Sequence, residues 1–207
     1  MGMIYEVIFD VETKKFFDVV EDKNPALLGV SIVSLYEREL DGQMGEIRGK
    51  MTSFWEKDFA DMWPIFAKAN RIIGFNSLKF DVPALKPCAP ANFSRLPHFD
   101  ILDQVKRIAG HRVSLDAIAK ETLGRYKIDS GANAIKYWHR GDPKSLALLK
   151  KYCEEDVRIT KEIYDFVLAN NYLMFKDHWN TARKVDLDFS YRDQAQTLPA
   201  GRQDSLF

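Results

Sequence analysis

The sequence predicts an α/β fold in which a mixed sheet of about five strands is flanked by helices. Three segments of strand length come first: residues 4–11 and 26–35 are apolar and rich in β-branched residues, and residues 46–54 are more polar. Short apolar segments then alternate with stretches of helical periodicity, and one long helical stretch follows. This order is typical of a sheet with helices on its faces. With 207 residues, 46% of them hydrophobic, the chain is long enough for one sizeable core.

The first three segments are expected to be neighbouring antiparallel strands, and the middle of the chain to alternate helices with strands. Asp58 can cap a helix, although Pro64 must kink that helix or mark its true start. Residues 71–75 are typical of a short buried strand and residues 78–85 of a turn or short helix. Residues 98–105 are expected to form a fifth strand.

Two capped helices are predicted in the last third of the chain. Ser114 can cap a helix that Gly124 ends, and a loop is expected over residues 125–141. Asp142 and Pro143 then open a long helix that reaches about residue 170. From residue 190 the chain is polar, so we expect one domain over residues 1–189 and a flexible tail over residues 190–207. One face of the long helix is expected to carry Leu149, Cys153, Val157, Thr160, Tyr164 and Val167.

Composition excludes several classes of protein. No apolar stretch is long enough to cross a bilayer and the first residues lack the basic region of a signal peptide, so we expect a cytoplasmic protein without membrane contact. Cys88 and Cys153 form no Cys-x-x-Cys pair, which argues against a disulfide framework or a zinc site, and both are expected to be reduced packing residues. The absence of glycine-rich phosphate-binding signatures argues against a doubly wound nucleotide-binding enzyme.

Three short acidic segments supply the candidate catalytic residues. Asp10 and Glu12 lie two apart on a predicted strand, where alternate side chains share a face. Asp81 ends the second segment, residues 76–81, and Tyr152 and Asp156 lie four apart on the long helix, where such residues are adjacent. Four carboxylates brought together could bind two Mg²⁺ or Mn²⁺ ions, which require oxygen ligands and promote phosphodiester hydrolysis.

Each segment also has a purely structural interpretation. An Asp-x-Glu pair is expected about once by chance in a chain of this size, and residues 186–188 form a similar pair that no later acidic segment completes. Tyr152 could be an aromatic residue at a helix surface, and Asp156 an ordinary solvated charge. Asp100 and Asp103 could cap the backbone or support the site. The ordered set of three segments favours the catalytic interpretation.

The three segments resemble the exonuclease motifs of the DEDD superfamily of 3′-5′ exonucleases, which have a ribonuclease H-like fold. Tyr-x-x-x-Asp at residues 152–156 is similar to the motif of the tyrosine subclass, DEDDy, and Lys151 stands where the histidine subclass would need histidine. Gly74-Phe75-Asn76 with Phe80-Asp81 is most similar to the proofreading domains of family B DNA polymerases and their stand-alone relatives. The resemblance spans about residues 5–168.

This resemblance implies a two-metal 3′-5′ exonuclease that acts on single-stranded DNA ends in replication or repair. Tyr152 would orient the attacking water, and Asn76 and Phe80 would contact the substrate strand. An exoribonuclease of the same fold remains an alternative, because the metal site contacts the phosphate, and only contacts near the sugar would distinguish RNA from DNA. A noncatalytic nucleic-acid or clamp-binding module is a second alternative. The metal ligands that the resemblance implies are Asp10, Glu12, Asp81 and Asp156.

Charge and aromatic residues indicate further substrate contacts. The formal net charge is zero, but residues 104–151 carry 11 Lys and Arg against four acids, which suits a phosphate-chain substrate. Within this region, Tyr137 and Trp138 lie among cations and could stack on unpaired bases, or could instead pack onto the core.

The C-terminal residues suggest a protein partner. Gln203, Leu206 and Phe207 resemble the short peptide that bacterial replication proteins insert into the sliding clamp. Asp204 departs from that pattern, in which leucine is common at this position. A sliding clamp is therefore a candidate partner.

Overall fold

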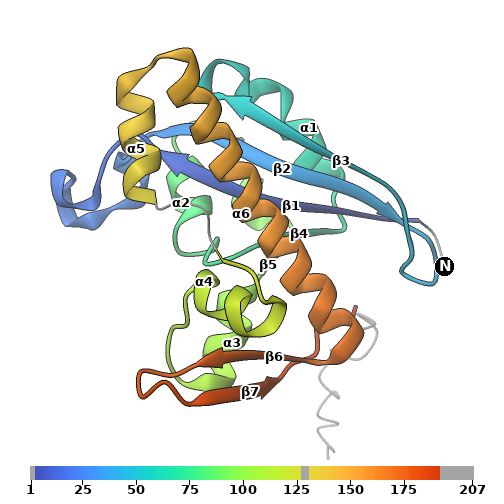
Figure 1. Ribbon diagram of the computed structural model, residues 1–207. Helices are drawn as coiled ribbons and strands as arrows, with labels where there is room; N and C mark the ends of the chain where they lie inside the picture. The colour runs from blue at the N-terminus through green and yellow to red at the C-terminus, as the bar shows by residue number, and fades with distance from the viewer. Residues whose placement is uncertain (1–2, 127–130, 192–207) are drawn as a thin grey trace, which may run out of the picture.

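The central sheet has five strands in the order β3-β2-β1-β4-β5, and it lies within the computed structural model's described residues, 3–126 and 131–191 (Figure 1). Strands β1 (Ile4–Thr13), β2 (Val30–Leu40) and β3 (Glu46–Trp55) are antiparallel neighbours. Strands β4 (Arg71–Gly74) and β5 (His98–Asp100) extend the sheet parallel to β1. The predicted fold class, a mixed α/β sheet of about five strands, is confirmed.

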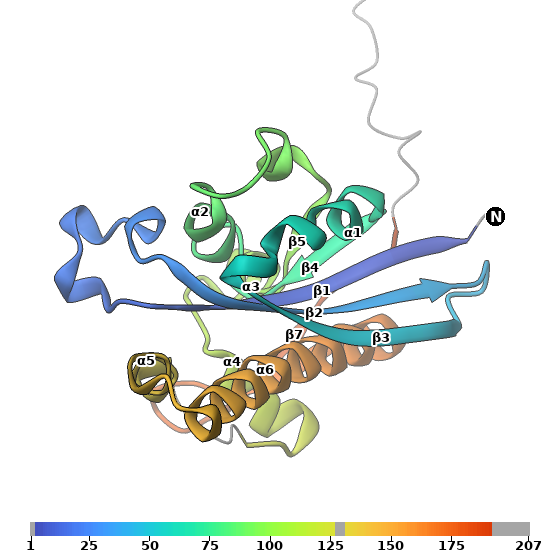
Figure 2. The same cartoon turned by 90° about the horizontal axis from the view of Figure 1, so that it is seen from above.

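Helices cover both faces of this sheet (Figure 2). Helices α1 (Trp63–Lys68) and α2 (Asp81–Leu85) lie on one face, and α5 (Gly131–Arg140) and α6 (Pro143–Asn170) lie on the other. Pro64 occupies the first turn of α1, so it marks the start of that helix. Short 3₁₀ segments occupy Phe17–Val19, Glu21–Lys23, Pro25–Leu27, Glu56–Asp61 and Phe93–Arg95.

The remaining elements pack beside the lower part of the sheet in Figure 1. Helix α3 (Ile101–Ala109) is followed by α4 (Leu115–Ile118), which continues as a π-helical turn, Ala119–Leu123, and ends at Gly124 in the left-handed conformation. Strands β6 (Tyr172–Lys176) and β7 (Ala182–Asp186) form an antiparallel hairpin that contacts α3 and α4. No helix in the described ranges is both long and apolar enough to span a bilayer.

The long helix α6 confirms the predicted caps and buried face. The Asp142 carboxylate accepts a hydrogen bond from the Ser145 N–H at 3.0 Å, and Asn171 ends the helix with a positive φ. The buried residues of α6 include all six that the periodicity predicts, Leu149, Cys153, Val157, Thr160, Tyr164 and Val167.

Several expectations from the sequence were wrong. The predicted fifth strand stops at Asp100, because the Asp100 carboxylate caps the first turn of α3 through the Asp103 N–H. The loop predicted over residues 125–141 contains α5, whose Ala134 and Ile135 are buried. The β6–β7 hairpin was not predicted. Cys88 is exposed and is not a packing residue, although both cysteines are free as expected.

A buried ionic network fixes α6 against β1. Glu6, which has no exposed surface, accepts hydrogen bonds from Arg38, from the Tyr164 hydroxyl at 2.9 Å and from the Tyr191 hydroxyl at 2.8 Å. Arg38 contacts Glu6 through Nε at 2.8 Å and Nη2 at 2.7 Å, and it also pairs with Asp165 at 2.8 Å. This network ties two strands, one helix and the end of the described chain together.

The spacing of these contacts aligns the helix with the strand. From Glu6 to Glu12 the strand advances about 20 Å, at about 3.3 Å per residue. From Tyr164 back to Tyr152 the helix advances about 18 Å, at about 1.5 Å per residue. The match means that contact between Glu6 and Tyr164 places Tyr152 and Asp156 over the end of β1, where Asp10 and Glu12 lie.

Candidate active site

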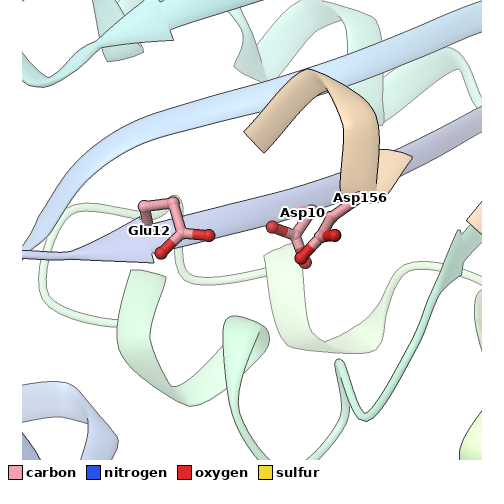
Figure 3. A group of neighbouring side chains, drawn as sticks. All are labelled: Asp10, Glu12 and Asp156. Carbon is pink, nitrogen blue, oxygen red and sulfur yellow. The ribbon is translucent and has the colours of Figure 1, made fainter. Parts of the chain in front are cut away.

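Asp10, Glu12 and Asp156 form an acidic cluster where β1 meets α6 (Figure 3). One carboxylate oxygen from each residue lies within 4.8 Å of the other two. Asp10 is half-buried, and Glu12 and Asp156 are 8% and 5% exposed. Alternation along β1 produces this arrangement, because Val7, Phe9 and Val11 pack on the opposite face of the sheet while Ile8 packs beneath α6.

The spacing of the acidic cluster suits a divalent cation. Two oxygens on opposite sides of one Mg²⁺ ion lie about 4.2 Å apart, given Mg–O bonds of about 2.1 Å. Oxygens within 4.8 Å of one another therefore need only small side-chain movements to share an ion. Three carboxylates held this closely also repel one another unless protons or cations offset their charge.

Asp81 lies beside this cluster, next to the part of β1 that extends beyond its pairing with β4. Its Oδ1 accepts a hydrogen bond at 3.2 Å from the backbone N–H of Val11, the residue between Asp10 and Glu12. Burial, together with the negative charges of Asp100 and Asp156, raises the pKa of Asp81 to about 7, against backbone hydrogen bonds that lower it. The structure therefore brings the fourth predicted carboxylate into the electrostatic field of Asp156.

Asp100 holds the turn that precedes Asp81. The Asp100 carboxylate, 3% exposed, accepts hydrogen bonds from the N–H groups of Asn76 at 2.8 Å, Leu78 at 3.0 Å and Asp103 at 3.3 Å. Asp100 thus has the capping role considered from the sequence, and through this turn it also positions α2, which begins at Asp81.

The backbone of this turn requires the residue types found at Gly74 and Asn76. A Cβ atom at Gly74 would lie 2.5 Å from the Ser77 Cβ, so only glycine allows the turn to pack against the end of β4. Asn76 adopts a positive φ of 63°, a conformation that asparagine tolerates better than most residues. These are local backbone requirements that place Asp81 correctly.

Tyr152 lies on α6 one turn before Asp156 and is 7% exposed. Burial raises the pKa of its hydroxyl well above the usual range, and the charges of Asp156, Glu12 and Asp10 add to this shift. Tyr152 is therefore a neutral phenol near the acidic cluster, able to donate a hydrogen bond. The neighbouring Cys153 is fully buried, with its Sγ 3.5 Å from the Asp10 carbonyl oxygen.

The four predicted substrate-binding residues lie in different surroundings. Asn76 lines a hollow of about 480 Å³ together with Asp10 and Asp156. Phe80 is partly buried, with its ring centroid 5.6 Å from that of Phe17.

Tyr137 and Trp138 lie on α5 and pack inward. Trp138 stacks on Trp55 with centroids 6.4 Å apart, and the Lys14 ammonium lies 5.3 Å from the Trp138 ring. Tyr137 packs against the small cluster that contains Tyr152. This is the packing interpretation considered from the sequence, and contact with a substrate stays a prediction for both residues.

Arg112 is a lining residue that the motifs did not identify. It lines the same 480 Å³ hollow as Asp10 and Asp156, with Phe75, Leu102, Val113, Ser114 and Leu115. Only the excess of Lys and Arg over residues 104–151 pointed to this part of the chain. Asp186 and Asp188 lie outside the acidic cluster. Gln203, Leu206 and Phe207 lie outside the described residues, so clamp binding stays a prediction.

Comparison with known proteins agrees with this arrangement. Residues 7–168 match the family model RNase_H_2 of the RNase H superfamily, a group that consists mostly of hydrolytic nucleases dependent on divalent metals. No curated protein matches the chain. The matched region begins within β1 and runs through most of α6, so it contains nearly all of the central sheet, all four acidic residues and Tyr152. The protein therefore belongs to the RNase H superfamily.

Proposed function

We propose that this protein is a 3′-5′ exonuclease that depends on two Mg²⁺ or Mn²⁺ ions and removes nucleotides from the 3′ end of single-stranded DNA. The observation that carries this proposal is the convergence of Asp10, Glu12 and Asp156 within 4.8 Å, with Tyr152 beside them. Membership of a superfamily of nucleases supports the hydrolytic chemistry. The tyrosine-subclass motif supports the exonuclease assignment and a role in replication or repair.

The roles of the residues follow from their positions. Asp10, Glu12 and Asp156 would hold the cations, and Asp81, which contacts β1 from the start of α2, would complete the ligand set. When bound, two such cations neutralise charge on the phosphate and lower the pKa of a water molecule. Tyr152 would donate or accept a hydrogen bond that orients the attacking water, because its phenol stays protonated next to Asp156.

Digestion of a labelled oligonucleotide tests the proposal. The purified protein with Mg²⁺ or Mn²⁺ and a 5′-labelled single-stranded DNA is expected to produce a ladder of progressively shorter products, and excess EDTA is expected to stop the reaction. The 5′ label separates stepwise removal from the 3′ end from internal cleavage, which would give unevenly spaced products.

Substrates of matched sequence show whether the protein prefers DNA or RNA. A DNA and an RNA oligonucleotide of the same sequence, in competition, show which one is degraded faster. Preference for RNA would replace the DNA assignment with exoribonuclease activity at the same site. Absence of products from both substrates, with no heat of Mn²⁺ binding by calorimetry, would support the noncatalytic alternative.

Replacement of Tyr152 by phenylalanine is expected to lower kcat about 10- to 100-fold with little change in KM. The variant removes one hydroxyl next to charged groups, and such a hydrogen bond contributes about 1.5 to 3 kcal/mol. Single-turnover digestion of the labelled oligonucleotide measures this effect. Tyr172→Phe on β6 is the matched control and should keep wild-type rates. A Tyr152→Phe variant as fast as this control would exclude an essential role for the hydroxyl.

A further inference from the structure

A second hollow, along α3, lies next to the hollow beside the acidic cluster. The first has a volume of about 480 Å³ and the second of about 230 Å³. Asn76, Leu102 and Arg112 line both, so the two hollows are adjacent. We call the pair the α3 groove. Its second part is also lined by Leu78, Lys79, Asp100, Asp103 and Lys106.

Three exposed cations line the α3 groove, namely Lys79, Lys106 and Arg112. Among the residues that the structure describes, none of the three takes part in an ion pair. The two acids in the second part of the groove, Asp100 and Asp103, are already engaged. Asp100 is buried and accepts three backbone N–H groups, and Asp103 pairs with Arg107 at 2.7 Å. The second part of the groove therefore offers three cations that its own acids do not pair with, whereas the carboxylates of Asp10 and Asp156 line only the first part.

Other basic residues from the same region of the sequence are held by acids on α6. Arg125 pairs with Glu155 at 3.3 Å and with Glu162 at 2.7 Å. Lys150 lies 3.8 Å from Glu154. Within the described part of the chain, the excess of Lys and Arg over residues 104–151 thus includes paired cations on the surface of α6 and unpaired cations, Lys106 and Arg112, beside the active site.

The shape and charge of the groove match a polyanionic strand that ends at the carboxylates. Asp10 and Asp156 line one end of the groove, Arg112 lies in the middle, and Lys79 and Lys106 lie at the other end. Cations bind the phosphates of single strands, and arginine suits them especially because its guanidinium can donate two parallel hydrogen bonds. The apolar side chains of Leu78 and Leu102 offer surface to the bases.

We propose that the strand whose 3′ end reaches the acidic cluster runs through the α3 groove, on the 5′ side of the scissile bond. Arg112 binds the first upstream phosphate, and Lys79 and Lys106 bind the phosphates that follow. This inference rests on the proposed exonuclease function, because it assigns the path of that substrate. It makes Lys79, Lys106 and Arg112 determinants of substrate length and affinity.

The length dependence of the reaction tests this path. The dinucleotide d(TpT) has only the scissile phosphate, whereas the octamer (dT)₈ has upstream phosphates that can reach the groove. The ratio of kcat/KM for the octamer to kcat/KM for the dinucleotide is expected to fall about 5- to 20-fold in Arg112→Ala, and also to fall in Lys106→Ala. Lys68→Ala, an exposed lysine on α1, is the charge-matched control and should keep the wild-type ratio.

A binding measurement makes the test independent of catalysis. Fluorescence anisotropy of labelled (dT)₈ in EDTA, at several salt concentrations, is expected to show weaker binding by Arg112→Ala. The slope of log affinity against log salt should become shallower by about 0.7 for each phosphate that the variant no longer neutralises. Arg112→Lys should recover part of the affinity, because it restores the charge but not the bidentate geometry.

The outcomes separate this inference from the proposed function. A wild-type protein that cleaves neither substrate would overturn the function, and the anisotropy data would still test the groove. Cleavage by the wild type together with groove variants that behave like Lys68→Ala would overturn the groove alone. If the groove variants lost kcat/KM equally on the dinucleotide and the octamer, the proposed path would also be overturned, because these residues would then contact only the terminal nucleotide.

Discussion

Replacement of Asp156 by asparagine is expected to lower the rate of oligonucleotide cleavage about a thousandfold. Asp156 is the one carboxylate that α6 contributes to the acidic cluster, and it lies within 4.8 Å of both Asp10 and Glu12. Bound cations stabilise the transition state by several kcal/mol, and each step of about 1.36 kcal/mol corresponds to a factor of ten in rate. Loss of one charged ligand should remove most of that stabilisation.

The Asp156→Asn variant should remain folded, which separates a catalytic effect from a structural one. Removal of one negative charge from a crowded acidic cluster reduces repulsion, so the free energy of unfolding should stay equal or rise. Digestion assays measure the cleavage rate, calorimetric titration measures Mn²⁺ binding, and thermal denaturation measures stability. Asp186→Asn, an acid on β7 whose side chain is 86% exposed, is the matched control. Wild-type activity in Asp156→Asn would refute the proposed ligand set.

Replacement of Glu6 by alanine is expected to lower the free energy of unfolding by about 3 to 5 kcal/mol. Glu6 is completely buried and accepts hydrogen bonds from Arg38, Tyr164 and Tyr191. Without this carboxylate, the buried Arg38 keeps only its ion pairs with Asp165 and Glu46 among the described residues. Breaking a buried ion pair is costly because the partner's charge remains without full compensation.

Urea denaturation of Glu6→Ala and of the wild-type protein measures this difference. Glu56→Ala is the control, because Glu56 is 58% exposed and its pair with Lys14 lies at the surface. A surface pair of this kind contributes at most about 1 kcal/mol. If Glu6→Ala lost no more stability than Glu56→Ala, the buried network would not hold α6 against β1 as the structure indicates.

Strong local signals in the sequence predicted much of the architecture. The first two strands are long and contain several β-branched residues, and α6 carries a cap, a proline at its start and an apolar face of regular period. Such features depend on near neighbours in the chain, so they can be read without the fold. The two residues on β1 and the two on α6 were placed on common faces for the same reason.

Shorter elements could not be predicted because their stability comes from distant contacts. The apolar segment at residues 98–105 divides between β5 and α3, and the division depends on the Asp100 carboxylate bonding to the Asp103 N–H. Helix α5 begins with Gly131 and is held by its packing on α6. The β6–β7 hairpin buries Leu173 and Val185 against the cluster that includes α6 residues.

The sequence alone specified which residue types could form the site, since alternation on a strand and the helical period are properties of consecutive residues. Tertiary packing was needed to bring Asp10 and Asp156 together, to place Asp81 against the Val11 N–H of β1, and to bring Arg112 to the hollow that Asp10 and Asp156 line. Distances between residues far apart in the chain depend on how the elements pack. Here that packing depends on the hydrogen bond between Glu6 and Tyr164 and on the hydrogen bonds that the Asp100 carboxylate accepts from the turn before Asp81.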